Sequence, residues 1–150
     1  MKMVHRLFRL SVLSSILVGI IGTILLSLFG LDIYNWWTQS QLSVSCEVWN
    51  TFVVGILFNA VWWTAMVAYP VTNKPYHFAV ASTITACLSV VVSYVLSFYL
   101  GLWGAAIGVM LFEFVMMLYV LPDGCRLLGM KPKEILSHLR EDCFLLKVKY

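Results

Sequence analysis

Charged side chains are scarce in this sequence: Asp, Glu, Lys and Arg make up 11% of its 150 residues, whereas hydrophobic residues make up 61%. A soluble domain carries roughly a quarter charged residues. The composition therefore excludes a water-soluble enzyme, a nucleic-acid binder and a disordered tail. The class that remains is a membrane protein, because a bilayer demands more apolar surface than a buried core does.

Recognisable catalytic and metal-binding patterns are also missing. The four cysteines share no metal-like spacing, and no histidine lies at ligand spacing from a carboxylate. Ser-His-Asp, phosphate-binding-loop and Rossmann glycine patterns are absent from the sequence. We therefore predict a protein that is not an enzyme and that binds no metal or cofactor.

Long uncharged runs occupy most of the chain, at residues 10–31, 48–73 and 75–112, and the last of them continues beyond Glu113 to residue 121. A spanning helix needs about 20 apolar residues, so the last run is long enough for two spans. The sequence predicts an all-α, polytopic membrane protein with the Gly101-Leu102-Trp103-Gly104 segment as the turn between the last two helices. The four predicted spans are 10–31, 47–70, 78–100 and 102–121.

The basic residues indicate the orientation of these spans. Three precede the first helix, Lys74 lies between the second and third, and the other six follow the fourth. The positive-inside rule then places both termini and the Lys74 loop in the cytoplasm. Four tryptophans fall at the opposite interface, as an aromatic belt does: Trp36, Trp37, Trp49 and Trp103.

The chain divides into a transmembrane region, 1–121, and a cytoplasmic tail, 122–150. Apolar residues after Pro132 recur at helical spacing in the tail, which predicts a short amphipathic helix on the membrane surface. The basic residues of the tail favour anionic headgroups there.

Small residues form stripes on the predicted helices. Such stripes let neighbouring helices approach closely in lipid, so we interpret them as packing faces. A water-filled groove lined by Ser and Thr is the alternative interpretation. The packing candidates are Ser11, Ser15, Gly19 and Thr23 in the first helix and the Gly-x-x-x-Gly pair Gly104 and Gly108 in the fourth.

Glu113 is the one Asp, Glu, Lys or Arg residue well inside a predicted span. An ionised carboxylate there costs at least roughly 2.5–3.5 kcal/mol, so it must face protein or water or be protonated. Two hypotheses follow: a proton- or cation-coupling site that lines a cavity, or a neutral carboxyl hydrogen-bonded to a neighbouring helix. At 100° per residue, Glu113 lies about 140° around the helix from Gly108, so the two need not share a face.

Asn59 lies at the centre of the second predicted helix, and Trp62 and Trp63 follow it at helical spacing. An amide beside flat aromatic rings could hold a sugar by hydrogen bonds and stacking. The other interpretation is a packed helix contact. We therefore list Glu113, Asn59, Trp62 and Trp63 as candidate residues of a substrate or ion pathway.

The order of features resembles a known family. The residues that carry the resemblance are 6–11, 28–33, 36–38, Pro70 with Asn73 and Lys74, and above all the segment GLWGAAIG at 101–108 followed by Glu113. Over roughly residues 5–135 the chain is similar to the C-terminal third of the polysaccharide exporters, of the O-antigen flippase type, in the multidrug/oligosaccharidyl-lipid/polysaccharide superfamily.

This resemblance implies part of a helical bundle in the bacterial inner membrane that flips an undecaprenyl-diphosphate-linked oligosaccharide by alternating access. Glu113 and the Asn59 face would then lie on the cavity side of the C-terminal bundle. Family members have about twelve or more helices, so the N-terminal bundle is missing here, and no Lys or Arg lies within a predicted span to meet a diphosphate. We expect a fragment, a truncated open reading frame or one subunit of a split transporter, inactive alone.

Two other hypotheses stay open. A self-contained, proton-coupled four-helix exporter could work as a homodimer with Glu113 as the shared cation site. It would resemble the small multidrug exporters, although those carry their key carboxylate in the first helix and this chain has none there. The chain could also be an accessory membrane subunit without transport function.

Overall fold

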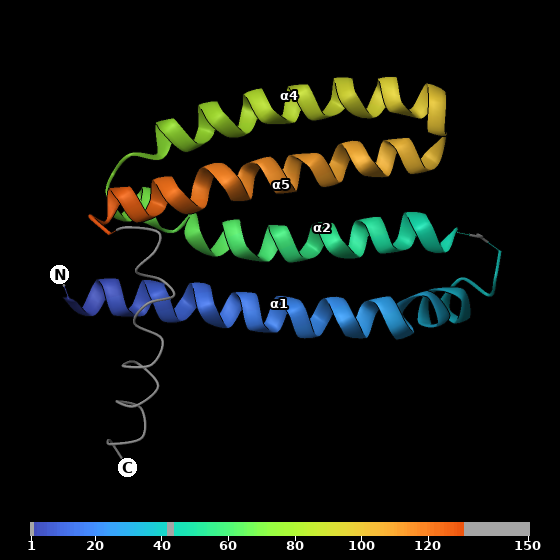
Figure 1. The fold of residues 1–150 in the computed structure, drawn as a ribbon, viewed down its shortest axis with the longest axis horizontal. Coiled ribbons are helices and arrows are strands. Elements are labelled where there is room, and N and C mark those ends of the chain that lie inside the picture. Colours follow the sequence, from blue (N-terminus) through green and yellow to red (C-terminus); the bar gives the residue numbers. More distant parts are fainter. Residues whose placement is uncertain (1, 42–43, 131–150) are drawn as a thin grey trace, which may run out of the picture.

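The computed structural model describes residues 2–41 and 44–130 and shows a chain of helices (Figure 1). Within that part of the chain there is no strand, and four helical segments are long and apolar enough to cross a membrane. The predicted fold class, an all-α membrane protein with four spans, is confirmed. The helices are α1 (Lys2–Trp37), α2 (Cys46–Ala65), α3 (Ala68–Val71), α4 (Pro75–Leu100) and α5 (Leu102–Leu127), and α2 and α3 together form the second span.

The helices extend beyond most of the predicted limits. Helix α1 begins at Lys2 and ends at Trp37, and α5 continues through Pro122 to Leu127. The predicted boundary between span and tail at residue 121 therefore falls inside α5. The reason is that an uncharged run marks the hydrocarbon layer, whereas a helix can continue into the headgroup region with its charges exposed. The predicted amphipathic helix of the tail lies in 131–150, outside the described residues.

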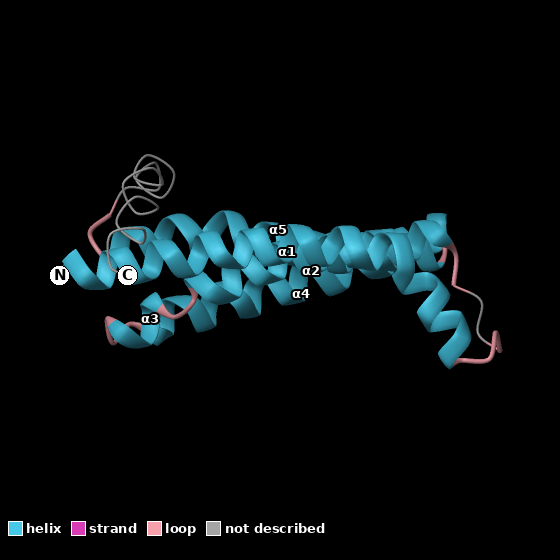
Figure 2. Ribbon diagram, turned by 90° about the horizontal axis from the view of Figure 1, so that it is seen from below, coloured by secondary structure: helices cyan, strands magenta, loops and turns pink. Residues whose placement is uncertain are grey.

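The four spans lie side by side in one row, in the order α1, α2, α5, α4 (Figure 1), and they overlap when the row is seen from one edge (Figure 2). The start of α1, the α3–α4 connection and the end of α5 lie together at one end of the long axis of the protein, at the left of Figure 1. We call this the basic end, because all the Arg and Lys residues in the described part of the chain belong to these segments. They are Lys2, Arg6, Arg9, Lys74 and Arg126.

The inner and outer helices of the row differ in burial. The most apolar stretches of α2–α3 and α5 are 33% and 28% buried, whereas those of α1 and α4 are each 6% buried. The outer helices therefore present most of their apolar surface to whatever surrounds the protein.

The main cluster of buried side chains sits toward the basic end, where α1, α2, α3 and α5 meet. Tyr69 and Met116 are the largest fully buried side chains in it. The break between α2 and α3 at residues 66–67 turns Tyr69 into this cluster, and Phe78 of α4 packs its ring 5.4 Å from the Tyr69 ring. The other buried members are Phe8, Val12, Trp62, Ala65, Ala68, Val120, Cys125 and Met130.

The turn between α4 and α5 consists of Gly101 alone, which lies in the predicted segment 101–104 and matches the residue left between the predicted spans 78–100 and 102–121. Gly101 has φ +60° and ψ −139°, a conformation that L side chains rarely adopt. Leu102, Trp103 and Gly104 already belong to α5. A one-residue turn holds the end of α4 close to the start of α5.

Candidate functional site

Glu113 lies midway along α5 and faces α2. Its Oε2 atom accepts two hydrogen bonds, one from Asn59 Nδ2 at 2.9 Å and one from Trp62 Nε1 at 2.6 Å. Both donors stand on α2 three residues apart, so they lie on the same side of that helix. The structure thus brings together three of the four residues proposed as a pathway.

The position of α5 in the row explains why this contact forms. Gly108 faces α4, and Glu113 lies about 140° further around the helix, which directs it toward α2 on the other side. Gly55 of α2 is buried opposite, and a Cβ built on it would lie 3.9 Å from Glu113 Cγ and 4.0 Å from Met110 Cα. These are ordinary van der Waals distances, so the α2–α5 seam has room for a methyl group at this position.

The two oxygens of the Glu113 carboxyl have different surroundings. Oε2 holds both N–H donors, whereas Oε1 has no hydrogen-bond partner among the described residues. A neutral carboxyl would therefore carry its proton on Oε1 and keep both bonds to α2. The contact between α2 and α5 therefore uses only one of the two carboxyl oxygens.

A cavity of about 140 Å³ lies against this carboxyl in the seam between α2 and α5. At about 30 Å³ of liquid volume per molecule, it has the volume of roughly five waters. Pockets for drug-sized ligands start near 300 Å³, so this cavity suits water or a small ion and not a sugar. Its lining residues are Thr51, Phe52, Gly55, Ile56, Asn59, Val109, Met110 and Glu113.

The predicted sugar-binding face takes a different form in the structure. The amide nitrogen of Asn59 and the indole N–H of Trp62 are both engaged by Glu113, and Trp62 is buried beside Phe112 and Phe78. Trp63 is 58% exposed, touches Trp62 edge-to-face and makes no hydrogen bond to Glu113. One residue of helix turns a side chain by about 100°, so Trp63 does not share the contact of Trp62 with Glu113 although the two rings touch.

A second carboxylate contact lies nearer the basic end. Tyr69 of α3 donates a hydrogen bond from its hydroxyl to Asp123 Oδ2 of α5 at 2.9 Å. Sequence reasoning missed this pair and also missed Gly55 of the cavity. The only available signal for the pair was a Tyr next to Pro70 and an acid just beyond the last predicted span, and neither specifies a partner.

The glycines proposed for packing lie in the seam between α4 and α5. A Cβ on Gly104 would overlap the carbonyl of Leu96, and a Cβ on Gly108 would lie 2.6 Å from Ser93 Cα. The hydroxyl of Ser89 donates to the Gly108 carbonyl at 2.8 Å. Helices α4 and α5 therefore approach as closely as backbone contact allows.

The stripe on α1 only partly faces α2. The Ser15 hydroxyl donates to the Ala60 carbonyl at 2.6 Å, and a Cβ on Gly19 would lie 2.9 Å from Leu57 Cδ1. The Thr23 hydroxyl is buried without a hydrogen-bond partner among the described residues. Ser11 is exposed and lines a separate groove instead of the helix contact.

Among residues 2–41 and 44–130, no group of three or more His, Cys, Asp or Glu side chains is placed to hold a metal ion. Comparisons of the chain with protein families, with curated proteins and with solved structures found no match.

Proposed function

We propose that this chain is the C-terminal part of an inner-membrane transporter that flips lipid-linked oligosaccharide for cell-surface polysaccharide, and that Glu113 is its coupling carboxyl. The observation that carries the proposal is the Glu113 site: an intramembrane carboxyl with one oxygen fixed by two N–H donors and the other unbonded beside a water-sized cavity. Intramembrane carboxyls are rare, and they mark ion and proton pathways in transporters.

The resemblance to polysaccharide exporters supplies the substrate class. Its strongest motif, residues 101–108 followed by Glu113, coincides with the tightest helix contact and with the carboxyl site. The 140 Å³ cavity suits a proton, an ion or water, so the path of the undecaprenyl-diphosphate-linked sugar would run outside this seam.

The arrangement of the four spans in a single row supports the proposal that transport requires further helices. Alternating access rocks one bundle against another around a central site, and a single row has no second bundle. The exposed apolar sides of α1 and α4 offer surfaces for an N-terminal bundle of a longer chain or for a second copy.

The distribution of charge supports the proposed orientation in a bacterial inner membrane. The described Arg and Lys residues gather at the basic end, whereas Asp32 and Glu47 lie toward the other end. By the positive-inside rule, both termini would lie in the cytoplasm.

The native size of the protein is the first test. An antibody to residues 131–150 would capture the polypeptide from its own membranes for intact-mass measurement. A much heavier species supports the exporter proposal and provides the complete protein for the next test. A mass of 17.0 kDa would mean that the four helices form a polypeptide of their own, and the proteins that co-purify with it would then separate a split-transporter subunit from a homodimer and an accessory subunit.

Glu113→Gln in that complete protein tests the coupling role. Gln keeps an oxygen that can accept both N–H bonds but cannot ionise. We expect export of long polysaccharide to fall at least tenfold while membrane abundance stays unchanged. Glu47→Gln is the matched control, because Glu47 is exposed in the first turn of α2, and it should export normally.

A non-transporting accessory subunit is the second candidate. The two hydrogen bonds at Oε2 would serve a structural carboxyl equally well. Normal export from Glu113→Gln would favour this candidate and reject the coupling role.

A further inference from the structure

The cavity beside Glu113 occupies only one part of the seam between α2 and α5. Its lining residues nearest the basic end are Asn59 and Glu113 themselves. From these two the lining continues to Thr51 on α2 and Val109 on α5, away from the basic end, because both helices begin at the opposite end (Figure 1). At 1.5 Å of rise per residue, Thr51 lies about 12 Å from Asn59 along α2. The cavity therefore extends from the carboxyl toward the end opposite the basic end.

Packed side chains fill the seam on the other side of the carboxyl. Trp62 donates its indole N–H to Glu113 and is buried. Its ring packs against Phe112 of α5 and Phe78 of α4. In the next turn of α5, Met116 is fully buried. All four of these apolar side chains belong to the main buried cluster or pack against it, so the cluster lies between Glu113 and the basic end.

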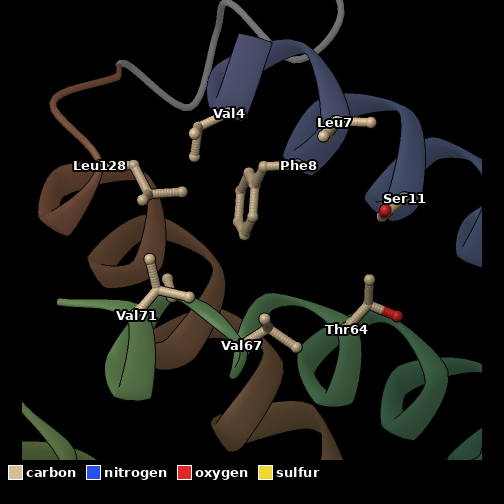
Figure 3. A pocket seen from close by; sticks show the side chains of 9 residues that line it. Val4, Leu7, Phe8, Ser11, Thr64, Val67, Val71 and Leu128 are labelled. Carbon is tan, nitrogen blue, oxygen red and sulfur yellow. The ribbon is translucent and has the colours of Figure 1, made fainter. Parts of the chain in front are cut away.

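A second hollow lies at the basic end, separate from the carboxyl. It is an apolar groove of about 330 Å³ between the start of α1 and the α2–α3 break, and it shares no lining residue with the Glu113 cavity. Figure 3 shows the Phe8 ring between the two walls of this groove. Phe8 and Ala68 line the groove and also belong to the buried cluster, so the groove ends on packed side chains.

The Glu113 cavity opens on one face of the row of helices. Phe52, Ile56 and Asn59 follow one another at spacings of four and three residues, so they lie on the same face of α2. Phe52 and Ile56 are exposed, as is Val109 on the α5 side of the cavity. We call these three exposed side chains, Phe52, Ile56 and Val109, the cavity rim.

The carboxyl indicates what the cavity contains in a membrane. Carboxyls within transmembrane segments almost always face a bundle interior or a water-filled cavity. Glu113 lines a cavity large enough for several waters, and only its Oε2 atom is bonded by the described residues. Water in the cavity would supply the remaining hydrogen bonds of the carboxyl.

The outer part of the cavity is polar. The Thr51 hydroxyl, which lines it, accepts a hydrogen bond from the indole N–H of Trp103 at 3.2 Å. Trp103 lies in the first turn of α5, where a tryptophan is typical of the membrane interface. Of the two ends of the protein, the one opposite the basic end therefore adjoins the cavity.

We propose that water reaches Glu113 only from the end of the protein opposite the basic end, through the cavity between α2 and α5. The inference deepens the proposed function and rests on it for its purpose, because it names the side from which a coupling proton or cation arrives. The route itself requires only that the chain spans a membrane. In the orientation given by the positive-inside rule, that side would be the outer face of the inner membrane.

Cysteine accessibility in the native membranes of the protein tests this route. The background keeps only Cys125, which is buried, and replaces the other native cysteines by serine. Ile56→Cys then places a thiol on the cavity rim, and Val54→Cys places one on another face of α2 at a similar depth. The probe is a permanently charged methanethiosulfonate reagent, which cannot cross the bilayer and attacks the thiolate that forms in water.

Two markers identify the side from which the reagent acts. Cys46, restored alone, is exposed at the start of α2, and Lys74→Cys lies in the α3–α4 connection at the basic end. In sealed vesicles where Cys46 reacts, we expect Ile56→Cys to react at least about tenfold faster than Val54→Cys. In vesicles where Lys74→Cys reacts, Ile56→Cys should not react. Phe52→Cys is a second rim probe, and labelling after unfolding in detergent gives the total thiol of each variant.

Two results would overturn the proposal. Equal rates for Ile56→Cys and Val54→Cys, including no reaction at either position, would show that the cavity rim does not border water. Reaction of Ile56→Cys from the basic end would show that the buried cluster does not close the seam. One-sided labelling together with normal export from Glu113→Gln would support the route and reject the coupling role, so the two proposals fail separately.

Discussion

Helix α5 packs against α4 through glycines and against α2 through a carboxyl, and the two seams differ in what they leave between the helices. In the α4–α5 seam, added Cβ atoms on Gly104 or Gly108 would collide with the α4 backbone. In the α2–α5 seam, a Cβ on Gly55 meets ordinary contact distances, and a cavity remains. Close backbone packing thus fixes one side of α5, while the other side keeps room for a polar group and water.

The difference has a physical cause. Helices in lipid associate through van der Waals packing and interhelical hydrogen bonds. In the α4–α5 seam van der Waals packing of the backbones dominates, and short serine hydroxyls add hydrogen bonds to carbonyls. The α2–α5 seam relies more on interhelical hydrogen bonds between side chains, which the N–H groups of Asn59 and Trp62 donate to the Glu113 carboxyl.

The largest effect is expected from Gly108→Ala. The new Cβ would lie 2.6 Å from Ser93 Cα, so α4 and α5 must separate. We expect the free energy of unfolding in bicelles to fall by about 2–3 kcal/mol. Gly22→Ala is the control, because a Cβ there meets nothing within 4 Å. Equal stability of the two variants would contradict a tight α4–α5 seam.

The next effect concerns the hydrogen bonds of Glu113. A double-mutant cycle with Glu113→Leu and Trp62→Phe should give a coupling free energy of about 1 kcal/mol, because interhelical hydrogen bonds in membranes are of this order. The same cycle with Trp63→Phe should give a coupling near zero, since Trp63 does not contact the carboxyl by hydrogen bond. A coupling free energy near zero for Trp62 as well as for Trp63 would show that the Trp62 bond is absent in the membrane.

A smaller effect is expected from Ser89→Ala in the α4–α5 seam. The variant loses the hydrogen bond to the Gly108 carbonyl, at a cost of about 0.6 kcal/mol in the free energy of unfolding. Ser82→Ala is its control, because the Ser82 hydroxyl bonds to Ala79 of its own helix. A loss at position 82 as large as that at position 89 would remove the distinction between the two serines.

The smallest effect on stability is expected from Gly55→Ala in the α2–α5 seam. The methyl group fits at 3.9 Å from its neighbours, so we expect a change of less than about 0.5 kcal/mol. The same methyl would narrow the cavity beside Glu113, so export by the complete protein should fall while folding is preserved. Loss of folding comparable to Gly108→Ala would mean that both seams are equally tight.

Some contacts of α5 could be anticipated from residue spacing. The 140° between Gly108 and Glu113 indicated that glycine and carboxyl need not share a face, and in the structure the two residues face different helices. Spacing did not reveal that Asn59 and Trp62 are the partners of Glu113, because it says nothing about which helix lies alongside. For the same reason it grouped Trp63 with Trp62, although the two indoles point in different directions.

Sequence alone determined that four helices are long and apolar enough to span a membrane, and roughly where each lies. That information is local, since a bilayer requires about 20 apolar residues whose backbone bonds are satisfied within the helix. The tertiary structure decided the order of the row, the break between α2 and α3 and the partners of Glu113. Lipid tails are as apolar as the side chains that face them, so the hydrophobic pattern does not encode which face meets which helix. Only close packing and the few interhelical hydrogen bonds make that choice.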